Sequence, residues 1–209
     1  MVKSRQHLKQ KSYTQSLARQ VRRRAAALAV AWTLITVPAS RTAASAATEY
    51  EVKAAYLLNF AKFVQWPVKA AAAQEDAFSI CVVGADPFGP ALDAIIEGET
   101  IGDKKVVARR ISKPQDATAC RILFISSSED SELPGVLAAL DDSSVLTVSD
   151  MPEFTRRGGM IHLILEDRRV RFEINLSAAE RAGLTLSSQL LKLAVRVTRK
   201  PRPGAGAGD

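Results

Sequence analysis

The sequence predicts an α/β protein of three layers, in which helices cover both faces of a mostly parallel sheet and a late antiparallel hairpin is added. Short apolar segments alternate along the chain with helical segments of about three turns, which is the order of a parallel sheet. The apolar segments also lack strict polar alternation, as strands covered on both faces do. These two observations favour an α/β/α sandwich.

Hydrophobic spacing and turn residues then place the elements in order. Helices are expected over residues 49–66, 90–97, 133–140 and 187–197. Strands are expected over residues 78–84, 105–111, 120–126 and 144–150, with a hairpin from 160–167 and 168–175. Pro67 is expected to end the first helix, and the hairpin is expected to turn near Glu166 and Asp167. Ser177 and Glu180 have the S-x-x-E spacing of a capping box, and Gly183 is placed to end that short helix.

The first and last of these helices carry apolar stripes that we expect to face the core. In the first helix the stripe is Val52, Ala55, Tyr56, Asn59/Phe60 and Phe63, widened by Leu57, Leu58 and Val64. In the last helix it is Leu190, Leu191, Ala194 and Val195. The alternative for the last stripe is contact with a second copy of the chain, so a homodimer stays open.

The start of the sequence has the pattern of a secretory signal peptide over residues 1–46. A basic segment precedes the 13 apolar residues 25–37, and Ala44-Ser45-Ala46 offers a cleavage site. The alternative is an uncleaved anchor, but a spanning helix needs about 20 apolar residues. We therefore expect an exported protein in the periplasm, with one domain over 47–198 and a disordered Pro/Gly-rich tail over 199–209.

The positive charge of the whole chain comes almost entirely from that first segment. Residues 1–46 hold nine of the 29 Lys and Arg residues and none of the 22 Asp and Glu residues. This leaves 20 cations against 22 anions in residues 47–209, so a nucleic-acid partner is not expected.

Cys81 and Cys120 are the only cysteines of the chain. An even count in an exported protein favours a disulfide, which requires the first and third predicted strands to be neighbours. The alternative is two buried thiols. A redox-catalytic pair is disfavoured because there is no C-x-x-C motif.

Residues that could carry chemistry are sparse after the signal peptide. His162 lies in an apolar strand pattern, and a triad with Ser126, Ser127 or Ser128 and Asp150 lacks the G-x-S-x-G motif. No ligands cluster for a metal. The turn GADPFG lacks a phosphate-binding pattern, so we expect Asp86 to cap a helix with Pro87 at its first position. We therefore expect no enzyme and no cofactor.

Four stretches resemble the YfiR family, whose domain is also called DUF4154. They are EYEVKAAYLLNFAKFVQWP (49–67), ICVVGADPFG (80–89), CRILFIS (120–126) and the long run over 146–194. Together they cover nearly all of residues 49–197 in the family's order, and the RFEINL…AGL…SSQLLKLA ending is the most specific part. Cys81 and Cys120 match a cysteine pair of the better-known members, whose second pair this chain lacks.

The resemblance implies a periplasmic α/β/α regulator rather than an enzyme. The family's name-giving member represses an inner-membrane diguanylate cyclase by binding the cyclase's periplasmic sensor domain, which lowers cyclic-di-GMP signalling and biofilm formation. Stress that removes the repressor frees the cyclase, and misfolding on reduction of the disulfides is one proposed route. Other members occur beside sensor kinases or outer-membrane receptors. We expect this chain to bind and repress such an inner-membrane signalling protein, a diguanylate cyclase or a sensor kinase.

The partner contact is expected in the late region, where polar residues of the exposed type are dense among apolar ones. The residues are Arg169, Arg171 and Glu173 on the hairpin, with Ser188, Gln189 and Lys192 on the final helix. The alternative function is a periplasmic small-ligand binder that reports to a sensor kinase or receptor, with its pocket at the DPFG turn and the strand ends.

Overall fold

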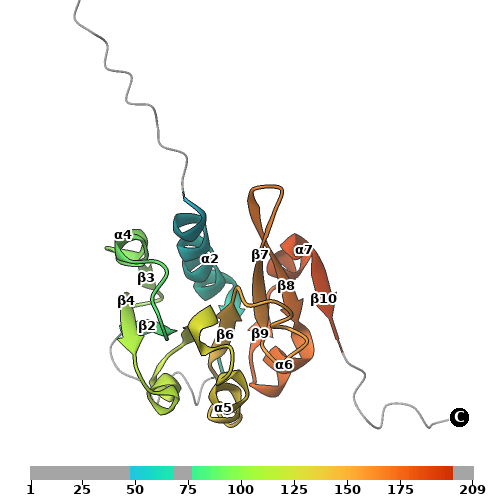
Figure 1. The fold of residues 1–209 in the computed structure, drawn as a ribbon. Helices are drawn as coiled ribbons and strands as arrows, with labels where there is room; N and C mark the ends of the chain where they lie inside the picture. Colours follow the sequence, from blue (N-terminus) through green and yellow to red (C-terminus); the bar gives the residue numbers. More distant parts are fainter. Residues whose placement is uncertain (1–47, 68–76, 200–209) are drawn as a thin grey trace, which may run out of the picture. The chain divides into compact units, whose positions relative to one another are not determined.

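The computed structural model describes residues 48–67 and 77–199 (Figure 1). The elements in chain order are α2 (Glu49–Phe63), β1 (Val64–Gln65), β2 (Ala77–Val83), α4 (Pro90–Ile96), β3 (Thr100–Ile101), β4 (Lys104–Ile111), η1 (Pro114–Ala119), β5 (Ile122–Ile125), η2 (Ser127–Glu129), α5 (Leu133–Ala138), β6 (Leu146–Ser149), β7 (Ile161–Glu166), β8 (Arg169–Asn175), α6 (Leu176–Arg181), β9 (Thr185–Leu186), α7 (Ser188–Leu193) and β10 (Arg196–Thr198). The predicted signal peptide and all but the first residue of the predicted tail lie outside the described residues.

Most of the strands form one mixed sheet. In the described part of the chain this sheet has eight strands in the order β10-β8-β7-β6-β5-β2-β4-β3. The five central strands β4, β2, β5, β6 and β7 are parallel, and β8 pairs antiparallel with β7. The edge strand β10 is parallel to β8, while β1 and β9 form a separate antiparallel pair. The predicted α/β class, with a mostly parallel sheet and a late hairpin, is confirmed.

Two hydrophobic cores lie on the two faces of the sheet. In β2, Phe78, Ile80 and Val82 belong to the larger core, whereas Cys81 and Val83 belong to the smaller one. The helices α2, α4 and α7 add side chains to the larger core, and η1 and α5 add side chains to the smaller core. Because the central strands bury apolar side chains on both faces, both faces need a helical layer.

A disulfide crosses the smaller core and joins Cys81 in β2 to Cys120, which directly precedes β5. β2 and β5 are neighbouring strands, and the two Cα atoms are 6.0 Å apart. The strand order that the predicted disulfide required is therefore present. Both cysteine side chains are buried.

The first helix is shorter than predicted and buries a slightly different face. It begins with a capping box between Thr48 and Glu51 and ends at Phe63, before Pro67, because Val64–Gln65 pair with β9. The buried residues are Lys53, Ala54, Leu57, Leu58, Phe60 and Ala61. In the predicted stripe, Phe60 is buried, Val52, Ala55, Tyr56 and Phe63 are half-buried, and Asn59 is exposed.

The prediction of one helix over 187–197 was wrong at its end. α7 stops at Leu193, and the chain then forms β10, which pairs with β8. The Val195 backbone N–H donates to Phe172 O at 2.9 Å, so sheet pairing replaces the last helical turns. Of the predicted buried side only Leu190 is buried, while Leu191 and Ala194 are half-buried and Val195 is exposed.

Two predicted caps also differ from the structure. Asn175 caps α6 in place of Ser177, because the Asn175 side chain accepts a hydrogen bond from Ala178 N at 3.1 Å. Gly89 and Pro90 begin α4 in place of Asp86 and Pro87. The predicted stop at Gly183 is correct: its φ of 74° is a left-handed conformation that ends α6.

The hairpin of β7 and β8 turns through Asp167 and Arg168, at or next to the predicted position. Their φ values of 50° and 60° fit the type I′ turn that suits a tight hairpin. The tip projects beyond the neighbouring strands (Figure 1). The hairpin thus carries its last residues away from the body of the sheet.

Candidate functional site

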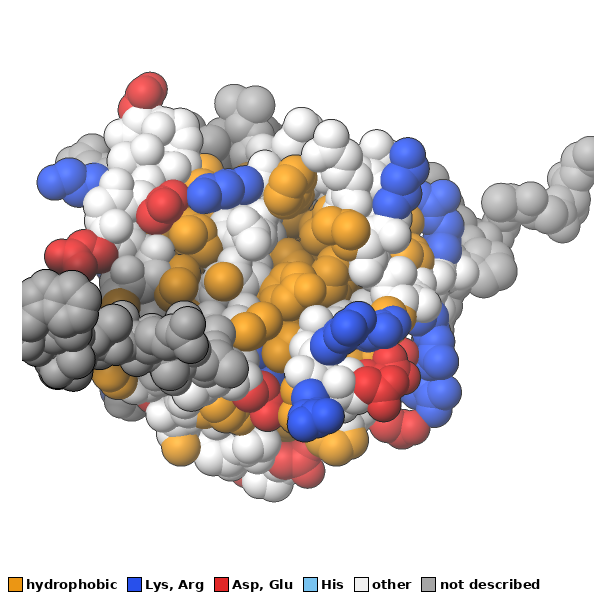
Figure 2. Space-filling model, turned by 90° about the horizontal axis from the view of Figure 1, so that it is seen from above, with side chains coloured by type: hydrophobic (Ala, Val, Ile, Leu, Met, Phe, Trp, Pro, Cys, Tyr) orange, Lys and Arg blue, Asp and Glu red, His pale blue; other side chains and the backbone are white. Residues whose placement is uncertain are grey.

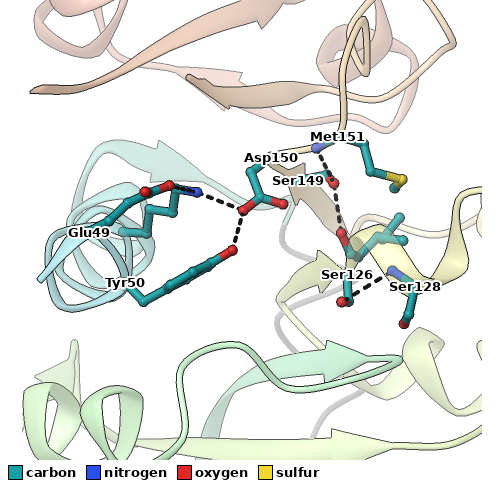
Figure 3. A network of polar contacts seen from close by, with 9 residues as sticks. Glu49, Tyr50, Ser126, Ser128, Ser149, Asp150 and Met151 are labelled. Atoms are coloured by element: carbon teal, nitrogen blue, oxygen red, sulfur yellow. Dashed lines mark hydrogen bonds and ion pairs between the residues drawn. The ribbon is translucent and has the colours of Figure 1, made fainter. Parts of the chain in front are cut away.

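A polar network lies where the parallel strands end. The carboxyl ends of parallel strands meet at one edge of a sheet, which is where α/β proteins commonly place their functional groups. Asp150 follows β6, Ser126 follows β5, and the first turns of α2 lie against Asp150 (Figure 3). The network therefore connects the first described helix to the middle of the sheet.

Lys53 is the centre of this network. Its side chain is only 3% exposed, although it is charged. Its Nζ lies 2.6 Å from Asp150 Oδ2 and also forms an ion pair with Glu49, one helical turn earlier. The Tyr50 hydroxyl donates to the same Asp150 oxygen at 3.0 Å, and Lys53 Nζ lies 4.5 Å from the centre of the Tyr50 ring. Lys53 thus holds the start of α2 against the end of β6.

The surroundings of this network shift two pKa values. Burial acts to lower the pKa of Lys53, but hydrogen bonds to Asp150 and Glu49 outweigh it and raise the pKa above its ordinary value. Burial, followed by the charge of Asp150, raises the pKa of Tyr50. Lys53 is therefore held in its charged form and Tyr50 in its neutral form.

The structure does not bring the conceivable catalytic triad together. Asp150 is occupied by Lys53 and Tyr50, whereas His162 Nδ1 faces Glu173 Oε2 at 3.6 Å. The Ser126 hydroxyl accepts from Ser128 N at the start of η2. These side chains are used in local structure and do not converge on a reacting atom.

The GADPFG turn is filled by its own aromatic residue. Phe88 is buried, with its ring 4.7 Å from that of Phe124 and 5.7 Å from that of Tyr50. Asp86 accepts from Phe88 N at 2.8 Å and pairs with Arg110 at 2.9 Å. The Phe88 side chain therefore fills the turn and packs in the larger core, at the position where related topologies bind phosphates.

A groove opens between the start of α2 and the projecting hairpin. It has a volume of about 470 Å³ and is lined by Glu49, Val52, Leu165, Arg168, Arg169 and Val170. Figure 2 views the molecule from the end at which the hairpin projects, and hydrophobic side chains gather near the middle of this face with Lys, Arg, Asp and Glu around them. This groove combines apolar side chains with Arg168, Arg169 and Glu49.

The structure divides the six predicted contact residues into two groups. Arg171 and Glu173 alternate with Phe172 and Ile174 of the larger core, so they lie on the opposite face of the sheet. The predicted helix residues Ser188, Gln189 and Lys192 are exposed on α7, which packs on the side of the larger core. Arg169 has the same alternation as Arg171 and Glu173, and it also lines the groove at the hairpin tip. The sheet therefore separates the three hairpin residues from the three residues of α7.

Glu173 is the most constrained of the six. Its carboxylate lies 3.2 Å from Arg196 of β10 and faces His162 of β7. Arg171 pairs with Glu166 at 3.5 Å across the hairpin. Glu173 therefore contributes to the packing of three adjacent strands as well as to any surface.

A family model described as DUF4154, YfiR/HmsC-like, matches residues 50–195. The chain belongs to the YfiR/HmsC-like family. The match includes α2, the disulfide, the hairpin and α7, so the elements that form the network and the groove all lie within the domain of the family. YfiR-like proteins are periplasmic regulators rather than enzymes.

Two solved structures resemble this YfiR-like fold. An ABC domain from Streptococcus pneumonia in complex with L-Trp is 11% identical with a TM-score of 0.44, and the alignment covers 63% of this chain and 59% of that chain. A conserved domain protein from Vibrio cholerae O1 biovar El Tor is 15% identical with a TM-score of 0.48, and the alignment covers 72% and 60%. This chain thus spans about 60% of the length of each solved chain. At this level of similarity, neither structure bears on its function.

Two further features were sought in the part of this YfiR-like chain that the structure describes. Within 48–67 and 77–199, no group of three or more His, Cys, Asp or Glu side chains is arranged to hold a metal ion. In the same residues, no helix has the length and apolar character to cross a membrane.

Sequence reasoning missed the Lys53 network. A lysine in an amphipathic helix is normally taken as part of the solvated face. The signal that was present is the spacing of Glu49 and Lys53, which are four residues apart and therefore adjacent on one helix face. Its partner Asp150 could be found only from the topology that places the end of β6 beside α2.

Proposed function

We propose that this chain is an exported regulator that binds the periplasmic part of an inner-membrane signalling protein and holds that protein inactive. The observation that carries the proposal is the family match over 50–195, because YfiR-like proteins are periplasmic regulators of diguanylate cyclases. With a diguanylate cyclase as partner, binding lowers cyclic-di-GMP output and biofilm formation. A sensor kinase is the other partner class.

The surface chemistry of the late region supports this proposal. The exposed large hydrophobic residues of the described part are Leu165, Leu193, Val195 and Val197, so all four lie in the hairpin or in the segment from α7 to β10. Exposed apolar side chains surrounded by charged ones are typical of sites where proteins bind one another. A partner that encloses the projecting hairpin would contact both groups of predicted residues.

The contact proposed here includes Arg169, Arg171 and Glu173 on the hairpin and Ser188, Gln189 and Lys192 on α7. We expect the double variant R171E/K192E to release the partner and raise cyclic-di-GMP several-fold, because each side of the hairpin then carries a reversed charge. The measurement is cyclic-di-GMP in cells that express the variant in place of the wild type.

The matched control is K105E/K113E, which reverses two exposed lysines, one in β4 near the opposite edge of the sheet and one in the loop that follows β4. Thermal unfolding of both variants should occur near the wild-type temperature, since surface charges contribute little to stability. Glu173 is left unchanged because its pairing with Arg196 would confound the result. The test needs a strain in which deletion of this chain raises cyclic-di-GMP. If R171E/K192E still represses cyclic-di-GMP in that strain, this contact assignment is excluded.

The disulfide supplies a candidate switch for the regulator. Reduction removes a cross-link that lies inside the smaller core, so the domain would lose a large share of its stability. A reducing stress would then free the partner through loss of the fold. This chain has one disulfide where the better-known family members have two. Reduction of that one bond would therefore be the only redox step.

A further inference from the structure

A cavity with a volume of about 490 Å³ lies near the amino ends of β6 and β7, away from the Lys53 network. This volume is within the range of pockets that bind small molecules. Its apolar walls come from α5 and the turn after it, from α6, and from the residue before β7. These wall residues are Leu137, Leu140, Met160, Ala178 and Ala182. α5 and α6 both lie at the end of the molecule opposite the hairpin tip (Figure 1), so the cavity is separate from the predicted partner contact on the hairpin.

Thr147 of β6 supplies a buried polar group to this cavity. The residue is only 2% exposed, and its Oγ1 accepts a hydrogen bond from Met160 N at 3.1 Å. Among residues 48–67 and 77–199, no acceptor is found for the Thr147 hydroxyl proton. A buried donor without an acceptor costs free energy, so a ligand that places a carbonyl oxygen here would be favoured.

Two side chains of opposite charge also line the cavity. Asp141 lies just after α5, and Arg181 is the last residue of α6; both are exposed. In the described part of the chain, neither side chain forms an ion pair with the other or with a third residue. The cavity therefore presents one free carboxylate and one free guanidinium group, which come from different segments.

Gly158 keeps one wall of the cavity free of a side chain. Its φ of 108° lies in the region that favours glycine, and a Cβ at this position would lie 3.4 Å from Leu137 Cδ1. A larger residue would be strained in its backbone and would project towards Leu137. The wall beside Leu137 is therefore backbone alone, which leaves the cavity its width at this point.

We propose that this cavity binds a short apolar peptide with free termini. The ammonium group of the peptide pairs with Asp141, its carboxylate pairs with Arg181, and its apolar side chains pack between α5 and α6. A backbone carbonyl between the two termini accepts a hydrogen bond from the Thr147 hydroxyl. The inference goes beyond the proposed regulatory function and does not depend on it.

The three polar groups of the cavity together favour a peptide over other small molecules. A guanidinium group matches a carboxylate, and a carboxylate pairs with an ammonium group. A ligand with a single charge would therefore leave either Arg181 or Asp141 unpaired. A free amino acid has both charges, but it has no carbonyl group between them for Thr147. A peptide of two or three residues supplies all three groups.

Calorimetric titration with leucyl-leucine and with trileucine tests the site, on protein purified from cells that express the full chain. We expect at least one of these peptides to bind. Free leucine should bind about tenfold more weakly or not at all, because it lacks the internal carbonyl group. Absence of binding by both peptides at millimolar concentration would overturn the proposal, and so would equal binding of free leucine.

Blocked forms of the peptide that binds assign its two termini. The N-acetyl form lacks the ammonium group and the amide form lacks the carboxylate, so each should bind the wild type about tenfold more weakly. D141N should no longer distinguish the free peptide from its N-acetyl form, and R181Q should no longer distinguish it from its amide. If both variants distinguish these forms as the wild type does, the peptide binds elsewhere and the assignment is wrong.

The variant A182L tests the cavity itself. Leucine at this half-buried position fills part of the cavity, so peptide binding should be lost. The control A138L adds the same side chain at an exposed residue of α5 outside the cavity and should leave binding unchanged. Thermal unfolding checks that both variants are folded, and undiminished binding by folded A182L would contradict the proposal. If A182L does not fold, D141N and R181Q decide the test, because both change exposed side chains.

Discussion

Removal of the disulfide in the variant C81A/C120A should lower the free energy of unfolding by about 4 kcal/mol in the chain-entropy model of cross-links. The bond joins residues 39 positions apart and therefore restricts a long loop of the unfolded chain. Both side chains lie in the smaller core with Leu123 and Ile125, so alanine keeps the site apolar. The measurement is urea-induced unfolding of the oxidised wild type and of the variant.

Reduced wild-type protein provides the control for this prediction. It should unfold at nearly the same urea concentration as C81A/C120A, since both lack the cross-link. The free energy of unfolding of a domain is about 5 to 15 kcal/mol, so the loss of the disulfide is a large fraction of the total stability. A variant with the same unfolding midpoint as the oxidised wild type would show that the disulfide does not determine stability, and would remove reduction as a route to release.

Replacement of Asp150 by alanine should destabilise the domain by about 3 kcal/mol, because it leaves Lys53 buried with fewer partners. Lys53 is 3% exposed and would retain Glu49, whose side chain is 34% exposed, as its one charged partner among the described residues. In the double variant K53M/D150A the charge is removed together with its partner. We expect the double variant to be more stable than D150A alone, as measured by urea unfolding of both proteins.

The same ion pair predicts a dependence of stability on alkaline pH. The pKa of Lys53 in the folded protein lies above its ordinary value of 10.5, so deprotonation favours the unfolded chain. The contribution is fully present below pH 10.5 and is lost as the pH rises through the higher folded value. K53M should lack this part of the pH dependence. For the replacement of Asp150, the contradicting result is equal stability of D150A and the wild type at neutral pH, which would exclude the role assigned to the Lys53 network.

The strands were predictable from sequence because each central strand is a short apolar run covered on both faces. Residues 122–125 and 146–149 are buried without exception, and apolar runs of this kind end clearly at polar loops. The disulfide was predicted from the even cysteine count of an exported chain, and it required β2 and β5 to be neighbours, as they are. These features depend on local composition and on a topology with few alternatives.

The boundaries that failed depend on contacts between distant parts of the chain. The helical pattern continues through Val64 and Gln65, but these residues pair with Thr185 and Leu186. The last helix was overextended for the same reason, since β10 exists only because β8 lies beside it. Tertiary pairing overrides local periodicity at such places, and a single sequence does not contain the pairing.

The candidate site was predictable only in part. Arg169 was selected from the density of polar residues in the late region, and it lines the groove. The groove also needs Glu49 and Val52, which lie more than a hundred residues away in the sequence. No local pattern connects the start of α2 to the tip of the hairpin, so this surface could be recognised only in the folded chain.

The central claim is that this chain binds an inner-membrane signalling protein. The most direct test is a pull-down of the full chain, tagged at its carboxyl terminus, after crosslinking of intact cells, with mass spectrometry of the membrane proteins recovered. We expect an inner-membrane protein with a periplasmic domain and a cytoplasmic cyclase or kinase domain, in yields that fall on reduction of the disulfide. Recovery of the chain alone, at a crosslinking efficiency that captures known periplasmic complexes, would contradict the claim.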